Sequence, residues 1–327
     1  MTRTLIGNWP MRLVLTALLV GLGMNVASAA DFPTRPVRIV VPFPAGSSTD
    51  VIARILAEKA STRLGQQVIV ENRPGADGAV GGSEIKRASP DGYTLLLASN
   101  SAMSGVPATR TSPPYEVTAD FTPITDIGRY NFFFFVNKDV PASSLAELVA
   151  HAKANPGKLN YGAGNITGRL SFATVVVRHG LELTYVPYRG EPPAMTDLIT
   201  GRIQAMVTTP GTGAPHVRGG KIRALSNVLH KRSQVLPDVP TIAEAGLLDF
   251  NIEPWAGLFG PARMPTDVVA TLNRAFVEAM GDPTVVQRMA ELDFVLTPST
   301  SSELAALVKR QLEAHRGIVA AAGIEIQ

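Results

Sequence analysis

Short apolar runs alternate with amphipathic segments along most of the chain. The apolar runs have the length and the Gly, Pro or Ser boundaries of buried strands, and they cover residues 37–41, 67–71, 94–98, 132–137, 159–162, 184–186, 205–208, 223–226 and 256–260. Segments with apolar residues at helical spacing lie between them, at residues 50–63, 79–88, 145–155, 170–179, 193–200 and 214–219. Strands that alternate with helices predict an α/β fold with mostly parallel sheets and helices on both faces.

Two regions depart from this alternation. The C-terminal third is periodic in Leu, Val and Ala, which predicts helices at residues 267–280, 284–292 and 302–322. Residues 99–126 are rich in Pro, Ser and Thr, and a structureless loop of that length is uncommon inside one compact domain. We expect this segment to wrap around one lobe before the chain crosses to a second lobe, and the length of 327 residues also favours two lobes.

The first residues have the pattern of a cleaved export signal. Arg3 and Arg12 precede an apolar run at residues 13–20, and Ala27-Ser28-Ala29 resembles a cleavage site. A membrane anchor is the alternative, but the run is shorter than the roughly 20 apolar residues that a spanning helix needs. We therefore expect residues 1–30 to be a signal peptide and the mature chain to be soluble, beginning at Ala30 or Asp31.

Composition excludes several classes of partner. The chain has 30 Lys and Arg against 27 Asp and Glu, and removing Arg3 and Arg12 leaves 28 against 27. The basic residues are scattered, which argues against a surface that follows a nucleic-acid backbone. The chain has no Cys, and its five His never occur at metal-ligand spacing. We expect neither a metal nor a cofactor, and no nucleic-acid partner.

Two loops of small residues precede predicted helices at the C-terminal ends of strands, where ligands bind in doubly wound sheets. Gly46 and residues 47–49 lie before the helix at 50–63, and residues 162–168 carry three glycines before the helix at 170–179. Unpaired N–H groups at helix starts attract anions. Ordinary helix capping explains either loop alone, but two such loops facing each other would form a clamp for a small anion.

Enzyme signatures are weak. Residues 162–168 resemble a dinucleotide-binding loop, but the glycine spacing is one residue too long and no acid follows at the required distance. The glycine-rich residues 72–82 lack the Lys of a phosphate loop, and Ser83-Glu-Ile-Lys86 lacks the companion motifs of an S-x-x-K enzyme. Phe132 to Phe135 is most simply a strand buried on both faces.

Several stretches together resemble a known family. "SPDGYTLLLAS", "NPGKLNYGAGN", "VPYRGEPPAMTDLITGRIQAM" and "LPDVPTIAEAG" occur in the order typical of the substrate-binding proteins of tripartite tricarboxylate transporters, the Bug-type periplasmic receptors. The resemblance covers essentially the whole mature chain. It implies the two-lobed Venus-flytrap fold of type II periplasmic binding proteins, with two crossing strands, and a cleft that holds a small carboxylate without catalysis.

The resemblance also implies boundaries and site residues. Residues 31–130 and 256–327 would form the first lobe and residues 131–255 the second, with the C-terminal helices packed mainly on the first. By motif, the ligand-binding residues are Phe43, Ala45, Gly46, Ser47, Ser48, Thr49, Asp50, Ser99, Asn100 and Ser101 in the first lobe, and Asn165, Ile166, Thr167, Gly168, Arg169, Tyr188, Arg189, Thr208 and Thr209 in the second. We expect Asp50 to organise its loop and not to meet the ligand.

Three departures from the family pattern affect the expected ligand. Ser47 and Ser48 replace consecutive glycines, Gly168-Arg169-Leu170 replaces a common Gln-His-Leu, and no acid follows at residues 207–209. Because a guanidinium pairs well with a carboxylate, Arg169 suggests a ligand with two acidic groups, one for each lobe. If Arg169 faces solvent or pairs with an acid of the protein, a monocarboxylate is the expected ligand.

The function expected from these observations is a periplasmic receptor, monomeric, that delivers a carboxylate to membrane transporter subunits. Two alternatives stay open. The same fold serves as the input protein of a signalling partner, which neighbouring genes would reveal. A periplasmic hydrolase is a weaker alternative, because no pair of nucleophile and base is identifiable in the sequence.

Overall fold

The computed structural model describes residues 1–2, 32–229, 231–246, 252, 254–321 and 323–324. Residues 1–32 and 33–327 form two separate units, and both lobes belong to the second. The expected signal peptide, apart from its first two residues, lies outside the described part of the chain. None of the helices in the described ranges combines the length and the apolar character needed to span a bilayer.

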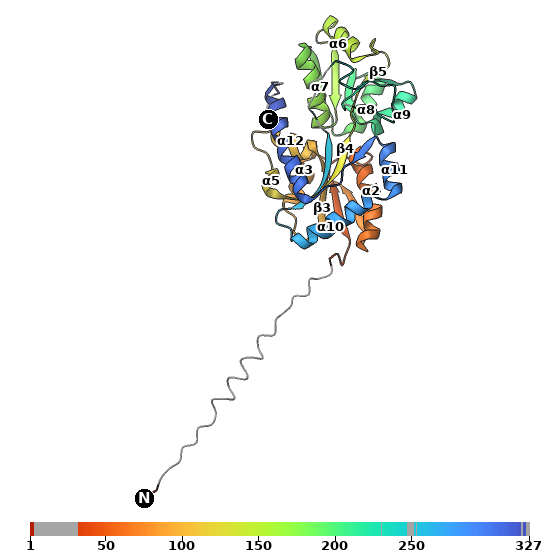
Figure 1. Ribbon diagram of the computed structural model, residues 1–327. Coiled ribbons are helices and arrows are strands. Elements are labelled where there is room, and N and C mark those ends of the chain that lie inside the picture. The colour runs from red at the N-terminus through yellow and green to blue at the C-terminus, as the bar shows by residue number, and fades with distance from the viewer. Residues whose placement is uncertain (3–31, 230, 247–251, 253, 322, 325–327) are drawn as a thin grey trace. The chain divides into compact units, whose positions relative to one another are not determined.

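A six-stranded sheet is the centre of the first lobe (Figure 1). Its strands lie in the order β11-β4-β10-β3-β1-β2, with bounds β1 Val37–Val41, β2 Val68–Asn72, β3 Thr94–Ser99, β4 Phe121–Tyr130, β10 Trp255–Pro261 and β11 Phe294–Leu296. Strand β1 pairs in parallel with β2 and β3, whereas β10 runs antiparallel to β3 and β4, and β11 antiparallel to β4.

The helices of the first lobe come from both ends of the described chain. They are α2 Ser48–Leu64, η1 Ala76–Gly78, α3 Ala79–Lys86, the π-helical turn η2 Ser101–Gly105, α4 Val106–Ala108, α5 Val117–Asp120, α10 Thr266–Met280, α11 Pro283–Glu291 and α12 Ser301–Ala321. The C-terminal helices α10 and α11 pack on α2, and α12 packs on β4 (Figure 1).

A five-stranded sheet is the centre of the second lobe. Its order is β7-β6-β8-β5-β9, with bounds β5 Phe133–Asn137, β6 Leu159–Ala163, β7 Leu183–Pro187, β8 Ala205–Thr208 and β9 Ile222–Asn227. Helices α6 Leu145–Ala154, α7 Ile166–His179, α8 Glu191–Thr200 and α9 Pro210–Arg218 gather around it (Figure 1). Strand β5 is buried on both faces, and Phe133 and Phe135 pack against Leu198, Ile203 and Met206.

The sequence explains where the helices begin and end. Ser47 caps α2 and Ser144 caps α6 through their hydroxyl oxygens, and Asn165 caps α7 through its amide oxygen. Gly65 and Gly180 end α2 and α7 in the left-handed conformation that glycine adopts without strain. Local capping chemistry therefore fixes the starts of the two helices that carry the small-residue loops.

All nine strands predicted from the apolar runs are present, within about one residue of the expected bounds. The expectation of a long irregular segment at residues 99–126 is wrong at both ends, because η2 and α4 follow β3 directly and β4 begins at Phe121 and lies inside the sheet. Pro123, the buried Asp126 and Gly128 hide this strand from a search for apolar alternation, and Gly128 is needed because a Cβ there would collide with the carbonyl of Val295. Both sheets are also mixed, and not mostly parallel as expected.

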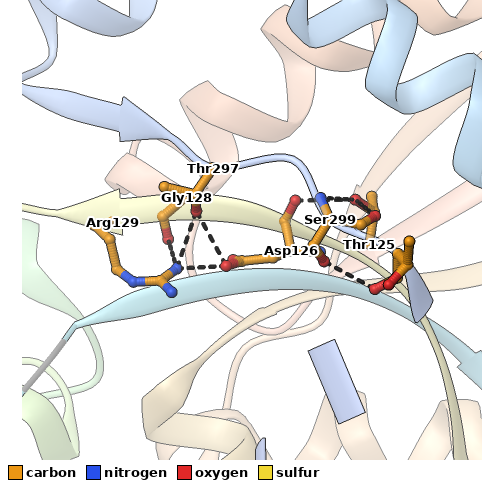
Figure 2. Close-up of polar contacts among 7 residues, drawn as sticks. Thr125, Asp126, Gly128, Arg129, Thr297 and Ser299 are labelled. Carbon is orange, nitrogen blue, oxygen red and sulfur yellow. Dashed lines mark hydrogen bonds and ion pairs between the residues drawn. The ribbon is translucent and has the colours of Figure 1, made fainter. Parts of the chain in front are cut away.

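Strands β4 and β10 connect the two lobes, and a polar cluster reinforces β4 (Figure 2). The carboxylate of Asp126 accepts hydrogen bonds at Oδ2 from Arg129 Nη1 at 2.6 Å and from Thr297 Oγ1 at 3.0 Å. Ser299 Oγ accepts from the backbone N–H of Asp126, and Thr125 Oγ1 donates to the Ser299 carbonyl. The segment after β11 is thereby tied to the crossing strand.

Candidate functional site

A narrow cavity lies between the two lobes, where four helices begin. Helix α2 of the first lobe and helices α7, α8 and α9 of the second all start at its wall. The wall is formed by Phe43, Pro44, Ser47, Ser48, Thr49, Ser99, Asn100, Ser101, Tyr130, Phe132, Gly164, Asn165, Thr167, Gly190, Glu191 and Thr209. The N-terminal ends of helices carry partial positive charge, so this arrangement favours an anion.

The start of α2 offers backbone donors to the cavity. In the described part of the chain, the N–H groups of Ser48 and Thr49 meet no hydrogen-bond acceptor, as is usual for the first turn of a helix. The Thr49 hydroxyl lies 2.8 Å from the Tyr130 hydroxyl, and the Ser48 hydroxyl lies 2.5 Å from that of Thr209. The two amides are therefore the groups of this loop that remain to be satisfied.

Asp50 organises the loop and is turned away from the cavity wall. Its carboxylate accepts hydrogen bonds from the Gly46 N–H at 2.9 Å, from Asn72 Nδ2 at 2.9 Å and from Arg54 Nε at 3.0 Å. Burial acts to raise the pKa of Asp50, but these bonds, above all that from Arg54, hold it below its usual value. The role expected for Asp50 from the sequence matches these contacts.

A buried acid, Glu191, forms part of the second-lobe wall. It is the first residue of α8 and is 6% exposed. Asn165 Nδ2 donates to its Oε1 at 3.0 Å, while the hydroxyls of Thr209 and Thr212 donate to its Oε2 at 3.0 and 2.9 Å. Burial raises the pKa of Glu191, although hydrogen bonds from these three side chains and from the side chain of Thr208 oppose the shift.

A buried amide, Asn100, forms part of the first-lobe wall. Its side chain is 1% exposed, and its Nδ2 lies 3.4 Å from Nε2 of His315 in α12. Its Oδ1 has no hydrogen-bond partner among the described residues. The cavity wall thus contains an amide oxygen with its accepting capacity unused.

The two lobes meet directly around the cavity. Ser101 Oγ lies 2.9 Å from Thr167 Oγ1 and accepts a hydrogen bond from the Thr167 N–H at 3.2 Å. Glycines permit close approach elsewhere, because a Cβ on Gly190 would lie 2.7 Å from Cγ of Pro44 and one on Gly105 would lie 2.6 Å from Cγ2 of Ile166. The lobes are therefore in contact on several sides of the cavity.

The structure brings ten of the nineteen expected site residues to this wall. They are Phe43, Ser47, Ser48, Thr49, Ser99, Asn100, Ser101, Asn165, Thr167 and Thr209. Nine lie behind the wall or beside it, namely Ala45, Gly46, Asp50, Ile166, Gly168, Arg169, Tyr188, Arg189 and Thr208. Gly168 has a packing role, since a Cβ there would lie 2.5 Å from the Val207 carbonyl.

Arg169 does not line the cavity. Its guanidinium lies over the ring of Tyr185, 4.8 Å from the ring centre, and it acts electrostatically on Asp77 of the first lobe. Tyr188 and Arg189 line a second, more open space, whose lining also includes Asp77 and Tyr185. These contacts join Arg169 to an aromatic ring and place it near an acid of the protein, and its pairing with a ligand carboxylate stays a prediction.

Six wall residues were missed by the sequence analysis, namely Pro44, Tyr130, Phe132, Gly164, Gly190 and Glu191. Tyr130 ends β4, the strand that was not predicted, whereas Phe132 was predicted only as part of a strand buried on both faces. Glu191 follows Gly190 directly after a strand, which is a position where ligands are expected. That adjacency was the available signal, but the burial of Glu191 cannot be read from its neighbours in the sequence.

The ionisable groups of the wall limit its chemistry. Among the described lining residues, Glu191 and Tyr130 can ionise, and neither Lys nor Arg is present. Burial raises the pKa of the Tyr130 hydroxyl far above its usual value, so this group is neutral. A search of the described residues finds no cluster of His, Asp and Glu suited to a metal ion. The wall offers neutral donors, helix ends and one acid.

Comparisons with known proteins place this geometry in a family. Residues 52–324 match the family described as "Tripartite tricarboxylate transporter family receptor". The protein BugT of Bordetella pertussis is 32% identical over 324 residues, which cover 96% of this chain and 99% of BugT. The periplasmic binding protein BugD superposes with a TM-score of 0.86 at 33% identity, over 90% of this chain and 100% of BugD.

A protein from R. palustris, solved with adipate, superposes with a TM-score of 0.85 at 30% identity, over 90% of this chain and 99% of that protein. The similarity extends through both lobes. The chain belongs to the receptors of the tripartite tricarboxylate transporter family and has the two-lobed fold of the periplasmic binding proteins.

Proposed function

We propose that this protein binds a small carboxylate in the cavity between its lobes and presents it to the membrane subunits of a tripartite tricarboxylate transporter. The observation that carries the proposal is the pair of unsatisfied N–H groups of Ser48 and Thr49 at the start of α2. Two adjacent amide donors at a helix start suit the two oxygens of one carboxylate. No cation in the wall is needed for this mode of binding.

The surroundings of these amides support the same class of ligand. Helices α7, α8 and α9 also begin at the cavity, and their ends add partial positive charge. The relative solved with adipate binds a dicarboxylate with the same fold. A ligand held by amides and hydroxyls can be released again when the lobes open, as delivery to a transporter requires.

Export, domain boundaries and oligomeric state belong to the same proposal. Receptors of this family are periplasmic, and we assign residues 1–30 as the signal peptide that directs this chain there. We assign residues 31–130 and 256–327 to the first lobe and residues 131–255 to the second, in keeping with the strands of the two sheets. The receptor acts as a monomer that docks transiently on the transporter.

Binding without catalysis is part of the same proposal. Its support is that no histidine lies among the described lining residues and that the acid of the wall, Glu191, already accepts hydrogen bonds from Thr209 and Thr212. Incubation of the purified protein with esters of the acids that bind should give no turnover, and turnover would contradict a pure receptor role.

The first experiment is a thermal-shift screen against monocarboxylates, dicarboxylates, tricarboxylates and aromatic acids. A ligand at about 100 times its dissociation constant stabilises a protein by roughly 2.7 kcal/mol. Binding of at least one acid is the expected result, with the corresponding amides and alcohols inactive. A screen in which only uncharged compounds stabilise the protein would contradict the proposal.

A pair of variants tests the role of the backbone amide. Ser48 is the first residue of α2, where proline is well tolerated. Ser48→Pro removes both the N–H and the hydroxyl, whereas Ser48→Ala removes only the hydroxyl. We expect Ser48→Pro to bind the carboxylate at least about tenfold more weakly than Ser48→Ala, as for loss of a hydrogen bond to a charged group. Equal affinities would show that this amide does not hold the ligand.

A further inference from the structure

Hydrogen-bond geometry fixes which atoms of the wall face a ligand as acceptors. Nδ1 of His315 lies 2.8 Å from the Gln311 carbonyl, which can only accept, so Nδ1 carries the proton. Burial lowers the pKa of His315, so the ring is neutral and Nε2 is an acceptor. Asn100 must then turn its Nδ2 toward His315, which leaves Oδ1 as the unsatisfied acceptor in the wall.

The same reasoning fixes the amide of Asn165 in the second lobe. Its Oδ1 accepts from the Gly168 N–H at 2.9 Å as the cap of α7, so its Nδ2 is the atom that donates to Glu191. The Thr208 side chain also interacts with this carboxylate, so the described partners of Glu191 are four neutral side chains. Glu191 therefore gives the wall a buried acid that no described cation balances.

The hydroxyls on the other side of Glu191 are already committed. Thr209 donates its proton to Oε2, so the short contact between Ser48 and Thr209 requires Ser48 to donate to Thr209. This series of hydrogen bonds runs from Ser48 in the first lobe through Thr209 to Glu191. Because the hydroxyl protons of Ser48 and Thr209 are both used in it, these two groups can only accept a hydrogen bond from the ligand.

A charge argument points in the same direction. A ligand carboxylate and Glu191 would share one cavity, and no described lining residue is cationic. Two carboxylates in a poorly hydrated site repel each other unless one is protonated or a cation lies between them. A positive group on the ligand itself would remove this conflict.

From these acceptors and this charge balance we propose that Glu191 and Asn100 determine specificity, and that they select carboxylates which also carry a hydrogen-bond donor, with an ammonium group preferred over a hydroxyl. This inference rests on the proposed carboxylate function and narrows it. The donor group meets the carboxylate of Glu191 or Oδ1 of Asn100, while the carboxylate of the ligand occupies the amides of Ser48 and Thr49. His315 is a positioning residue that keeps the Asn100 oxygen toward the cavity.

The test uses two matched ligand series with the full mature receptor. The first contains butanoate and its derivatives with a hydroxyl or an amino group at C2, C3 or C4. The second contains succinate, malate and aspartate, which share one skeleton and differ in the group at C2. Isothermal titration should give at least about tenfold tighter binding for the best donor-bearing member of a series than for its unsubstituted parent, and tightest binding for an amino member.

Variants then distinguish a change of specificity from a loss of folded protein. The measured quantity is the ratio of affinities between an amino acid and its unsubstituted parent within one variant, which a loss of folded protein does not alter. Glu191→Gln should reduce this ratio about tenfold, and Asn100→Leu should reduce the preference for donor-bearing acids over the parent. Glu182→Gln makes the same change of charge at an exposed position of the second lobe and should keep the wild-type ratio.

The possible failures are distinguishable. If carboxylates bind but the parent acids bind as tightly as their derivatives, the selectivity is wrong and the carboxylate function stands. If Glu191→Gln weakens every acid equally, Glu191 is structural and the proposal falls. If no carboxylate of either series or of the wider screen binds, the proposed function itself falls, and the selectivity with it.

Discussion

Two buried carboxylates in this molecule face opposite electrostatic situations. Asp126 lies in the crossing strand β4, where Arg129 donates to it at 2.6 Å (Figure 2). Glu191 lies in the cavity wall, where Asn165, Thr209 and Thr212 are its hydrogen-bond partners. Burial raises the pKa of both acids. Within the described part of the chain, one buried acid has a positive partner and the other has only neutral donors.

The difference separates a structural use of charge from a functional one. Asp126 and Arg129 balance each other and join β4 to Thr297, beyond β11, so the pair holds the region through which the chain passes between lobes. Glu191 has hydrogen bonds but no counter-charge. A protein that needed this acid only for packing could use a neutral side chain at lower cost. The unbalanced charge is easier to understand if a ligand completes it.

The largest effect is expected from removing the positive partner of Asp126. Arg129→Met keeps an apolar stem of similar length but leaves a buried carboxylate without its cation. Breaking a buried ion pair on one side costs about 3 kcal/mol or more, and urea denaturation should show this loss in the free energy of unfolding. Arg288→Met is the control, because Arg288 pairs with Glu58 at the exposed surface and should cost less than about 1 kcal/mol.

A similar cost for both arginine variants would contradict the comparison, since it would mean that Asp126 does not depend on Arg129. The double variant Arg129→Met with Asp126→Leu sharpens the test. Replacement of both members of a buried pair by apolar residues is often nearly neutral. The double variant should therefore be more stable than Arg129→Met alone.

A smaller effect is expected from removing one neutral donor of Glu191. Thr209→Val deletes the hydroxyl that donates to Oε2 and also the partner of Ser48 in the first lobe. Loss of a hydrogen bond to a buried charged group costs about 2 kcal/mol. Thr200→Val, at the exposed end of α8, is the control, and equal losses of unfolding free energy in the two variants would show that Glu191 does not need the Thr209 hydroxyl.

The fold could be predicted from the sequence wherever one physical rule controls an element. Apolar runs specified nine strands, and Ser47, Ser144 and Asn165 mark helix starts because their side chains cap the first turn. Strand β4 was not predicted, because its sequence, with Pro123 and Gly128, has no alternating apolar pattern. Its place in the sheet depends on partners that arrive more than 120 residues later, in β10 and β11. Pairing at that sequence distance leaves no local signal.

The loops that form the site could be predicted from the sequence, but the charged side chains that line it could not. Ser48 and Thr49 follow a strand and start a helix, so their position at the wall could be inferred. Arg169 and Glu191 have the same kind of position, yet the wall includes Glu191, whereas Arg169 stacks on Tyr185. Which of two charged residues turns inward depends on the packing of several elements. The sequence does not show this, and the expected second carboxylate of the ligand rested on Arg169.

Thr49 and Tyr130 form a buried hydrogen-bonded pair without charge, which can be compared with the two buried carboxylates. Their hydroxyls lie 2.8 Å apart and are buried. Thr49→Val should cost about 1 kcal/mol in the free energy of unfolding and should weaken ligand binding, because it leaves the Tyr130 oxygen unpaired. The variant Thr49→Val with Tyr130→Phe should lose less than the sum of the single variants, and strict additivity in this cycle would contradict a direct bond.

The smallest expected effect is a change in how stability depends on pH. The folded protein holds the proton of Glu191 more readily than the unfolded chain, because burial raises the pKa of this acid above its ordinary value of 4.5. The contribution of Glu191 to stability is therefore complete below about pH 4.5 and is lost as the pH rises through the folded pKa. Glu191→Gln should lose stability less steeply with rising pH across this window than the wild type does, as measured by urea denaturation at a series of pH values. Glu182→Gln should overlay the wild-type profile. If Glu191→Gln also overlays it, Glu191 titrates alike in the folded and unfolded chains, and the contrast with Asp126 would lose its electrostatic basis.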